Sequence, residues 1–379
     1  MDANTLKSKF RALYKTDPIL VKSPGRINII GEHTDYNNGF VLPGAIDKAI
    51  YVTVSARADD EIHLFAQHGE EHYITSLNAL EPSKLGWPNY ILGVADQLKK
   101  RNYQIGGFNL CIDGDVPSGA GLSSSAAVEC ATALALDQLF GLSIARIDLA
   151  FIGQQAEHSF AGVNCGIMDQ FASVFGKKNQ VVLLDCRSME YQYVPLDMDG
   201  YTLVLINSNV KHALADTGYN DRRRSCELGV AWVQEFYPQV RSLRDVDLEM
   251  LEQIVRPRSA DVFKKCRFVV EENARVLHAV EKLRHGDLAG LGQLMFQTHE
   301  GLSRSYEVSC TELDFLVNAV QANQAVLGAR MMGGGFGGCT LNIIRDDAVN
   351  ALKSEITNSY INEFGHSPDF YVVKTGEGT

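Results

Sequence analysis

The chain has 379 residues, of which 45% are hydrophobic and 21% are charged. This length exceeds the roughly 100 to 200 residues of an ordinary domain, and the composition is that of a folded globular protein, which excludes fibrous and mostly disordered classes. Acidic residues outnumber lysines and arginines by 46 to 35, for a net charge of −11. Because general attraction to a phosphate backbone needs the opposite sign, we expect no nucleic-acid partner.

The amino terminus is predicted to form an amphipathic helix, because Leu6, Phe10, Leu13 and Tyr14 recur at helical spacing between basic residues. It lacks the apolar run of a signal peptide, and no stretch approaches the roughly 18 apolar residues that cross a bilayer. The eight cysteines contain no Cys-x-x-Cys pair, which favours small buried thiols over disulfides or a zinc ribbon. We therefore expect a cytoplasmic protein with no membrane partner.

In the first half, apolar runs bounded by Gly, Pro, Asn or Asp predict strands, and apolar residues that recur every three or four positions predict helices. The predicted strands are 19–22, 26–30, 50–56, 61–66, 108–112 and 181–185, and the predicted helices are 89–100, 124–140 and 147–158. A short polar stretch around 189–200 precedes the next predicted strand, 202–206. We place a domain boundary there, between an amino-terminal domain, 1–195, and a carboxy-terminal domain, 196–379.

The second half carries longer amphipathic helices, predicted at 221–236, 268–283, 288–296 and 311–321. Ser309 and Glu312 have the spacing of a capping box, and Asp287 precedes an apolar helical stripe, so two of these helices have chemical start signals. A strand, a glycine-rich loop and a second strand are predicted through 331–345.

The first chemically informative segment is 117–126, Pro-Ser-Gly-Ala-Gly-Leu-Ser-Ser-Ser-Ala, between a predicted strand and a predicted helix. Two glycines let the backbone approach a ligand, and the free amides of the helix start add a positive dipole end. Together they favour a cradle for nucleotide phosphates, with serine hydroxyls able to cap the helix, bind phosphate or reach a metal ion. The alternative is a glycine-rich turn with serine caps. No Lys follows the glycines as in a Walker A loop, so P-loop NTPases are disfavoured.

The second segment is 25–36, Gly-Arg-Ile-Asn-Ile-Ile-Gly-Glu-His-Thr-Asp-Tyr. A short apolar strand delivers Glu32, His33 and Asp35 into one loop, where carboxylates and a ring nitrogen can bind a polyhydroxylated ligand. The alternative is a solvated polar turn, and a metal site is disfavoured because one His and two carboxylates lack a zinc-ligand pattern. Three further histidines, His63, His68 and His72, are interpreted as exposed residues of a loop.

The third segment is 333–338, Gly-Gly-Gly-Phe-Gly-Gly. It formally contains Gly-x-Gly-x-x-Gly, but a dinucleotide fold needs that motif between a strand and a helix, and 339–344 is predicted to be a strand. Protein-kinase motifs are missing as well. The loop is interpreted as permitting close packing against a ligand or against the other domain.

In this order, the three segments strongly resemble the GHMP small-molecule kinases, and 25–36 resembles the galactokinase signature. Segment 162–170, Gly-Val-Asn-Cys-Gly-Ile-Met-Asp-Gln, and Tyr219 followed by three arginines, 222–224, are also similar to galactokinases, so the resemblance covers nearly the whole chain. It implies an α+β kinase of two domains with the active site in the cleft between them. It also implies transfer of the γ-phosphoryl group of ATP to O1 of α-D-galactose, the first committed step of galactose catabolism, with Mg²⁺ as cofactor and no obligatory protein partner.

The resemblance also assigns site residues. Asp169 would accept or polarise the O1 proton, with a helix-capping Asp as the alternative, and Arg26 would keep that carboxylate ionised and stabilise the transferring phosphoryl group, with an ordinary strand-edge ion pair as the alternative. The implied sugar-binding residues are Arg26, Glu32, His33, Asp35, Gly166, Asp169 and Tyr219. The implied ATP-binding residues are Trp87, Gly119, Gly121, Leu122, Ser123, Ser124 and Ser125, and the implied Mg²⁺ ligands are Ser125 and Glu157.

Several alternatives stay open at this point. Trp87 could belong to the core, Glu157 could be a charged helix end, and the arginines 222–224, near a predicted helix start, indicate nearby acids, a bound anion or a solvated face. A kinase for N-acetylgalactosamine or arabinose would differ only in the cleft. A sugar sensor on the same fold is disfavoured because Ser125 and Ala126 form the Ser-Ala pair that such fungal relatives lack, and a dehydrogenase is supported only by the carboxy-terminal glycines.

Overall fold

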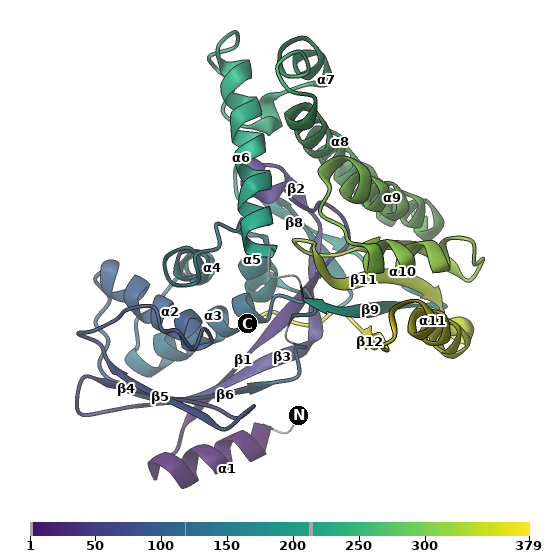
Figure 1. Cartoon of the computed structure of the whole chain (residues 1–379). Helices are drawn as coiled ribbons and strands as arrows, with labels where there is room; N and C mark the ends of the chain where they lie inside the picture. Colours follow the sequence, from purple (N-terminus) through teal and green to yellow (C-terminus); the bar gives the residue numbers. More distant parts are fainter. Residues whose placement is uncertain (1–2, 118, 212–214) are drawn as a thin grey trace.

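The computed structural model describes residues 3–117, 119–211 and 215–379, and its strands form sheets of five, four and three strands (Figure 1). Ser118 of the predicted phosphate loop lies outside these ranges. The predicted α+β class is confirmed, because helices pack against mostly antiparallel sheets.

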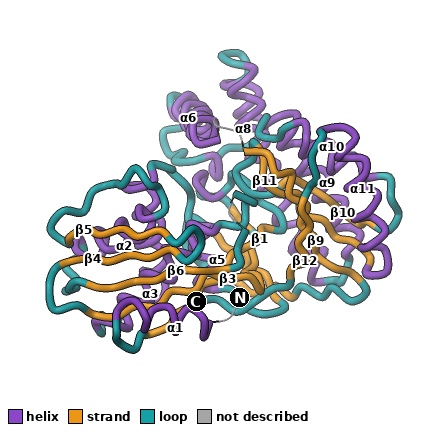
Figure 2. Tube along the Cα trace, turned by 60° about the horizontal axis from the view of Figure 1, so that its bottom comes forward, coloured by secondary structure: helices purple, strands orange, loops and turns teal. Residues whose placement is uncertain are grey.

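The five-stranded sheet is built from the first third of the chain, and parallel pairing occurs between β4 and β6. Helices α2 to α5 cover one face and α1 packs on the other, where Leu6 and Phe10 meet Phe65 and Cys111 (Figures 1 and 2). The strand order is β1 (Ile19–Asn28), β3 (Pro43–Ala56), β6 (Phe108–Gly114), β4 (Glu61–Ala66) and β5 (Glu71–Ser76). The helices are α1 (Ala3–Tyr14), α2 (Pro88–Lys100), α3 (Ser124–Phe140), α4 (Arg146–Ala156) and α5 (Met168–Phe175).

The four-stranded antiparallel sheet belongs to the second half, and its core is formed with helices α10 and α11. Helices α6 and α8 extend from it as an arm with a core of its own (Figure 1). The strand order is β10 (Val326–Met331), β11 (Gly337–Arg345), β9 (Tyr201–Lys211) and β12 (Asp369–Val373). The helices are α6 (Ala215–Gln234), α7 (Leu248–Met250), α8 (Ala260–Arg284), α9 (Leu288–Glu300), α10 (Thr311–Gln321) and α11 (Val349–Phe364).

The third sheet contains one strand that precedes helices α2 to α5 in the chain and two that follow them. These strands are β2 (Phe40–Val41), β7 (Gln180–Asp185) and β8 (Tyr191–Pro195). Strand β8 lies inside the stretch that was interpreted as a polar connection. Short 3₁₀ turns occur at Asp35–Asn37, Leu243–Asp245 and Asp346–Ala348, and π-helical turns at Glu157–Ala161, Leu251–Val255 and Gly301–Tyr306.

Two local predictions need correction. The predicted strands 19–22 and 26–30 are one strand, β1, because a shift of register between Pro24 and Arg26 absorbs the proline without ending the pairing. Ser309 does not cap α10, since its hydroxyl donates to Asp314 (2.6 Å) and Cys310 stands at the N-cap. The cap by Asp287 is confirmed, because its carboxylate accepts from the amide of Gly290 (2.7 Å).

The interpretation of His63, His68 and His72 as residues of a loop is wrong in part, because His63 and His72 lie on β4 and β5, while His68 lies in the turn between them.

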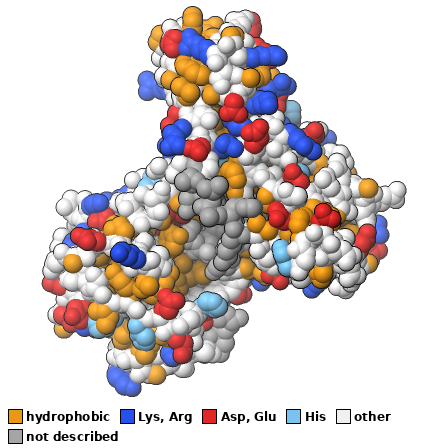
Figure 3. All heavy atoms as spheres, in the orientation of Figure 1, with side chains coloured by type: hydrophobic (Ala, Val, Ile, Leu, Met, Phe, Trp, Pro, Cys, Tyr) orange, Lys and Arg blue, Asp and Glu red, His pale blue; other side chains and the backbone are white. Residues whose placement is uncertain are grey.

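All eight cysteines are free thiols and five are fully buried, as predicted. Acidic and basic side chains are interspersed over the helical arm on the face shown in Figure 3. None of the helices within the described ranges is long and apolar enough to cross a membrane.

Candidate active site

The predicted sugar-binding residues converge on one cavity of about 180 Å³, although they come from four distant segments. These segments are the end of β1 with the loop that follows it, the region from Glu157 to the start of α5, the first half of α6, and the glycine-rich loop. The lining consists of Arg26, Glu32, His33, Asp35, Glu157, Val163, Cys165, Gly166, Met168, Asp169, Tyr219, Gly333 and Gly334.

The pair formed by Arg26 and Asp169 lies at the centre of this arrangement. Arg26 is buried, and its Nε donates to Asp169 Oδ1 (2.8 Å) while its Nη1 donates to the carbonyl of Gly121 (2.6 Å). The second carboxylate oxygen, Oδ2, accepts from the hydroxyl of Ser123 (2.6 Å). Asp169 is the second residue of α5 and its side chain keeps 26% exposure, so the carboxylate is oriented by two donors while it still reaches the cavity.

Glu32 is held by a residue that the sequence analysis missed. Arg330 on β10 is fully buried and donates to Glu32 Oε1 (2.8 Å), to the carbonyl of Ile29 (2.8 Å) and to the carbonyl of Asn28. The amide of Gly333 donates to the same carboxylate (2.9 Å). Burial raises the pKa of Glu32, but the charges of Arg330 and Arg26 outweigh it and hold the pKa below its ordinary value. The sequence contains a signal for Arg330, since a charged residue stands inside an apolar strand just before the glycine-rich loop.

His33 belongs to a hydrogen-bonded aromatic cluster. Its Nδ1 is 2.8 Å from the hydroxyl of Tyr36, which is 2.7 Å from the hydroxyl of Tyr306, a second residue that the sequence analysis missed. Burial lowers the pKa of His33 to about 4, so its ring is neutral at neutral pH. Its Nε2 is buried and finds no hydrogen-bond partner among the described residues. The ring of Tyr219 lies 5.3 Å from that of His33.

Asp35 and Gly166 approach each other across the cavity. A methyl group added at Gly166 would overlap the Asp35 carboxylate, so only glycine leaves space at this point. Burial and the charge of Asp169 raise the pKa of Asp35 to about 6. The carboxylate is therefore half protonated at mildly acidic pH and ionised above it.

The predicted phosphate loop has the expected backbone. Gly119 and Gly121 have positive φ angles of 74° and 73°, and the loop leads directly into the amino terminus of α3. Leu122 contributes differently from a ligand-binding side chain, since it is buried in the core while its carbonyl accepts from the amide of Arg26 (3.1 Å). Ser123 is the N-cap residue but makes no capping hydrogen bond, because its hydroxyl is directed to Asp169. Ser124 begins α3.

The glycine-rich loop of the second half packs against this phosphate loop. A Cβ at Gly121 would lie 3.3 Å from the carbonyl of Met332, and one at Gly338 would lie 3.5 Å from the backbone of Ala120. The interpretation of segment 333–338 as a packing loop is therefore confirmed, and its contact is with the first half of the chain.

Glu157 lies beside the phosphate loop at the start of a π-helical turn. Its carboxylate accepts hydrogen bonds from Ser125, from Gln170 Nε2 (2.9 Å) and from the thiol of Cys165 (3.4 Å). Burial and the charge of Asp169 raise its pKa to about 7. The described ranges contain no group of three or more His, Cys, Asp and Glu side chains poised to hold a metal ion by themselves. The carboxylate and the hydroxyl do supply two hard oxygen donors, the kind that Mg²⁺ takes when phosphates and water complete its shell.

Trp87 is not part of the cavity lining. It stands at the N-cap of α2, partly buried against the main core, and its ring N–H donates to Glu71 (2.7 Å). Trp87 therefore has the contacts of a core residue, which was the alternative to its assignment as an ATP-binding residue.

The expectation that the arginines 222–224 lie near a helix start is wrong, because α6 begins several residues earlier. Arg222 donates to the carbonyls of Tyr306 (2.6 Å) and Glu307 (2.8 Å). Arg223 donates to the carbonyl of Asn164 (2.8 Å), and Arg224 pairs with Asp221. Two of the three thus fasten segments next to the cavity.

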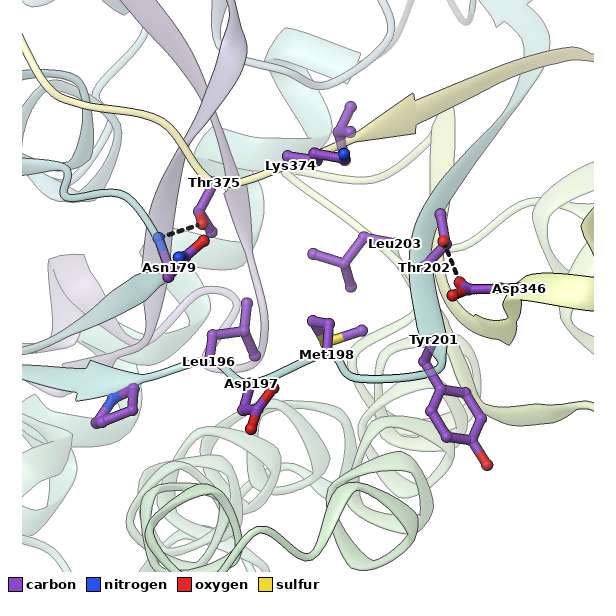
Figure 4. A pocket seen from close by; sticks show the side chains of 12 residues that line it. Asn179, Leu196, Asp197, Met198, Tyr201, Thr202, Leu203, Asp346, Lys374 and Thr375 are labelled. Atoms are coloured by element: carbon purple, nitrogen blue, oxygen red, sulfur yellow. Dashed lines mark hydrogen bonds between the residues drawn. The ribbon is translucent and has the colours of Figure 1, made fainter.

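A larger cavity, of about 530 Å³, lies elsewhere, between the β8–β9 connection, β9 and the end of β12 (Figure 4). Its walls combine Leu196, Met198 and Leu203 with the hydrogen-bonded pair Thr202 and Asp346 (2.5 Å). It contains none of the predicted site residues, so cavity size alone does not locate the candidate site.

Comparison with known proteins agrees with this geometry. Residues 89–177 match the GHMP kinases N terminal domain, 279–362 match the GHMP kinases C terminal family, and 8–56 match the galactokinase galactose-binding signature. The galactokinase of Thermosipho africanus is 40% identical over 94% of this chain and 98% of its own length. That of Clostridium beijerinckii is 40% identical over 99% and 98%.

Among solved structures, the crystal structure of Lactococcus lactis galactokinase complexed with galactose has a TM-score of 0.93, with 34% identity and coverage of 99% of this chain and 98% of that one. Methanococcus jannaschii mevalonate kinase shares the fold, with a TM-score of 0.69 at 16% identity. The fold and the site thus define a small-molecule kinase of the GHMP superfamily. Within that superfamily, this chain belongs to the galactokinase family.

Proposed function

We propose that this protein transfers the γ-phosphoryl group of ATP to O1 of α-D-galactose, giving galactose 1-phosphate and ADP. The observation that carries the proposal is the Arg26–Asp169 pair. It lines the cavity formed by the predicted sugar-binding residues and is hydrogen-bonded to the predicted phosphate loop. Family membership supports the same reaction.

Asp169 is the proposed base. Arg26 and Ser123 donate to its two oxygens and hold it in one orientation, and each oxygen keeps a further acceptor site for the O1 proton. The buried guanidinium of Arg26 places positive charge beside this carboxylate, where the phosphoryl group transfers. Because phosphoryl transfer depends on positioning and charge stabilisation, a fixed carboxylate beside a fixed cation meets its main requirements.

Sugar recognition is assigned to Glu32, His33 and Asp35, with Gly166 and Tyr219 shaping the wall. Glu32 and Asp35 offer acceptors to hydroxyl groups, and the unpartnered Nε2 of His33 offers one more polar contact. An epimer that leaves one of these buried groups without a partner would be rejected strongly.

ATP is assigned to the backbone of Gly119, Gly121, Leu122, Ser123 and Ser124. The contact of Trp87 with adenine stays a prediction, because its ring packs against the core and its N–H is bonded to Glu71. Ser125 and Glu157 would hold Mg²⁺, whose charge would stabilise the triphosphate and the transferring group when bound. We further propose that residues 1–195 and 196–379 are the two domains of this kinase and that the free thiols fit a cytoplasmic setting.

The test is Asp169→Asn, with Asp197→Asn in the larger cavity as a matched control. We expect Asp169→Asn to keep galactose affinity within a few-fold by calorimetry and to lose about 10²- to 10⁴-fold in kcat, the range typical of general-base removal. The control should match wild type in both. Near-normal turnover in Asp169→Asn would reject the assigned base, and failure of galactose to release ADP in a panel with arabinose and N-acetylgalactosamine would reject the substrate.

A further inference from the structure

Three buried polar side chains from different elements meet next to the proposed cation site. Glu129 comes from α3, Gln170 from α5 and Glu157 from the turn after α4. Nε2 of Gln170 donates to Glu129 Oε2 (2.9 Å) and to Glu157 Oε2 (2.9 Å). Glu129 and Gln170 have no exposed surface, and the cavity lining includes Glu157 but neither of them.

The amide of Gln170 bridges the two carboxyl groups. Its NH₂ group gives one hydrogen to an oxygen of Glu129 and the other to an oxygen of Glu157. Because the amide is planar, the Glu157 carboxylate is tied to a defined position relative to α5. Packing around the network is tight, since a Cβ at Gly153 would lie 3.1 Å from Gln170 Cγ and 3.2 Å from Glu129 Cβ.

A purely structural role explains the network poorly. Oε1 of Glu129 and Oε1 of Gln170 are buried and find no partner within the described part of the chain. Buried polar atoms without partners cost stability, and an apolar side chain of similar volume would avoid that cost. The polar groups are therefore explained better by what they do to Glu157.

The network also connects the two proposed catalytic functions. Asp169 and Gln170 are consecutive residues of α5, so their side chains leave the helix about 100° apart. One is directed to Arg26 and Ser123, the other to Glu157 and Glu129. A single helix start thus fixes the proposed base and the proposed cation ligand relative to each other.

We propose that Gln170, backed by Glu129, is a positioning residue that fixes the Glu157 carboxylate for a divalent cation and thereby sets the cation affinity of the nucleotide site. The inference rests on the proposed function, because it takes Glu157 as a cation ligand. Removing a group that orients a metal ligand typically weakens metal affinity about 10- to 100-fold.

The experiment measures Mn²⁺ binding by electron paramagnetic resonance in the full chain with a non-hydrolysable ATP analogue. Gln170→Met keeps the volume and removes the amide, and Gln170→Asn keeps the amide but shortens it by one methylene. Both should bind Mn²⁺ about 10- to 100-fold more weakly and need correspondingly more Mg²⁺ for half-maximal rate, while galactose affinity changes less than twofold. Gln97→Met, at another buried glutamine that donates to Ser159, should behave as wild type.

Glu157→Gln in the same assay separates the two levels of the argument. If Glu157→Gln weakens Mn²⁺ binding and both Gln170 variants bind as wild type, the positioning role is overturned and the cation site stands. If Glu157→Gln binds Mn²⁺ as wild type, the cation assignment falls and this inference falls with it. A lower melting temperature with unchanged Mn²⁺ affinity in Gln170→Met would show a structural role and also overturn the proposal.

Discussion

At the scale of single residues, Ser123 combines a strained backbone with a short contact to the proposed base. Its φ of 55° is in the left-handed region, which costs a non-glycine residue about 1 kcal/mol. Gly119 and Gly121, in the same loop, also have positive φ angles. A glycine in place of Ser123 would remove the backbone strain, because glycine adopts such angles without a steric penalty. The hydroxyl that donates to Asp169 is the feature that a glycine would lack.

We therefore expect Ser123→Gly to separate stability from activity. Its free energy of unfolding should change by no more than about 2 kcal/mol, measured by urea denaturation, because relief of the left-handed strain offsets part of the lost hydrogen bond to Asp169. Its kcat should fall about 10- to 100-fold, since a hydrogen bond to a charged group contributes roughly 1.5–3 kcal/mol. Ser143→Gly is the matched control, because Ser143 is exposed and has a φ of 58°. It should gain up to about 1 kcal/mol in stability with unchanged kcat, and equal activity in the two variants would contradict the role of the hydroxyl.

The pH dependence of sugar binding should follow Asp35. Its pKa is raised to about 6, and a protonated carboxyl offers poorer acceptors, so galactose affinity should fall as pH drops through about 6. His33 does not contribute in this range because its pKa is lowered to about 4. Calorimetric titration with galactose between pH 5 and 8 measures the effect. A dissociation constant that stays flat across that range would contradict this account.

The raised pKa of Asp35 also affects the stability of the fold, and this effect runs opposite to the effect on galactose affinity as pH changes. The folded state binds the Asp35 proton more tightly than the unfolded chain does, so the contribution of Asp35 to wild-type stability should decline as pH rises from about 4 through 6. Asp35→Asn removes this decline, and its melting temperature relative to wild type should therefore increase over that interval while its galactose affinity stays low.

At the scale of elements, the start of α5 is positioned by the absence of a side chain at Gly166. The loop before α5 brings this glycine against Asp35, so the sugar-binding loop and the helix that carries Asp169 approach at van der Waals distance. A larger residue there would move the flexible Asp35 carboxylate rather than the backbone. The geometry of binding is thus more sensitive to this position than the fold is.

Gly166→Ala should raise the KM for galactose at least about tenfold and lower kcat less, with a melting temperature close to that of wild type. Steady-state kinetics over a range of galactose concentrations, with MgATP saturating, gives both constants. Gly106→Ala is the control, because a Cβ there makes only ordinary contact with Phe140 at 3.6 Å. Unchanged galactose KM in Gly166→Ala would mean that Asp35 has room that the structure does not give it.

Local signals in the sequence were sufficient for most elements in the first half but not for their pairing. Periodicity and the glycines predicted α2, α3 and the phosphate loop, whereas β1 was divided in two because Pro24 looked like an end. Ser309 was assigned as a cap from spacing alone, although Asp314, five positions away, competes for its hydroxyl. Side-chain hydrogen bonds of this kind are decided by tertiary packing, which spacing does not report.

The same limit explains which site residues were found. Asp169 and Arg26 were assigned through family resemblance, and the structure brings them to 2.8 Å across 143 positions. Arg330 and Tyr306 were missed because each acts through a distant partner. Arg330 contacts Glu32, 298 positions away, and Tyr306 contacts Tyr36, 270 positions away. The position of Arg330 inside an apolar strand marks it as unusual, but no local pattern identifies the partner of either residue, so the structure was needed to connect them to the site.

At the scale of the whole molecule, two of the connections between the halves of the chain bear directly on the position of the site residues. One is Arg330, which reaches from β10 to Glu32 and to the backbone at the end of β1. The other is the carboxy-terminal segment 374–379, which leaves β12 and runs back across the first half. In that segment the amide of Gly376 donates to the carbonyl of Ala45 (2.8 Å), and the amide of Gly378 donates to the carbonyl of Gly176 (2.8 Å).

This segment ends beside the elements that carry the proposed catalytic pair. The amide of Thr379 donates to the carbonyl of Ser173 on α5 (2.8 Å), its hydroxyl is hydrogen-bonded to the hydroxyl of Ser23 on β1 (2.5 Å), and Ser173 in turn donates to the carbonyl of Pro24. Asp169 lies on α5 and Arg26 lies on β1. The segment is therefore a brace between the two elements whose relative position sets the 2.8 Å contact of the pair.

Removing residues 376–379 should weaken that brace without touching the cavity. At about 1 kcal/mol for each hydrogen bond lost, the free energy of unfolding should fall by roughly 2–4 kcal/mol, measured by urea denaturation. Because the pair Arg26 and Asp169 would be held less firmly, kcat should fall several-fold more than galactose affinity does. Glu377→Ala is the control, since this exposed side chain makes only a long bond to the amide of Lys178 (3.3 Å) and its loss should change neither quantity. A shortened chain with wild-type stability and kcat would show that β1 and α5 keep their relative position without the segment.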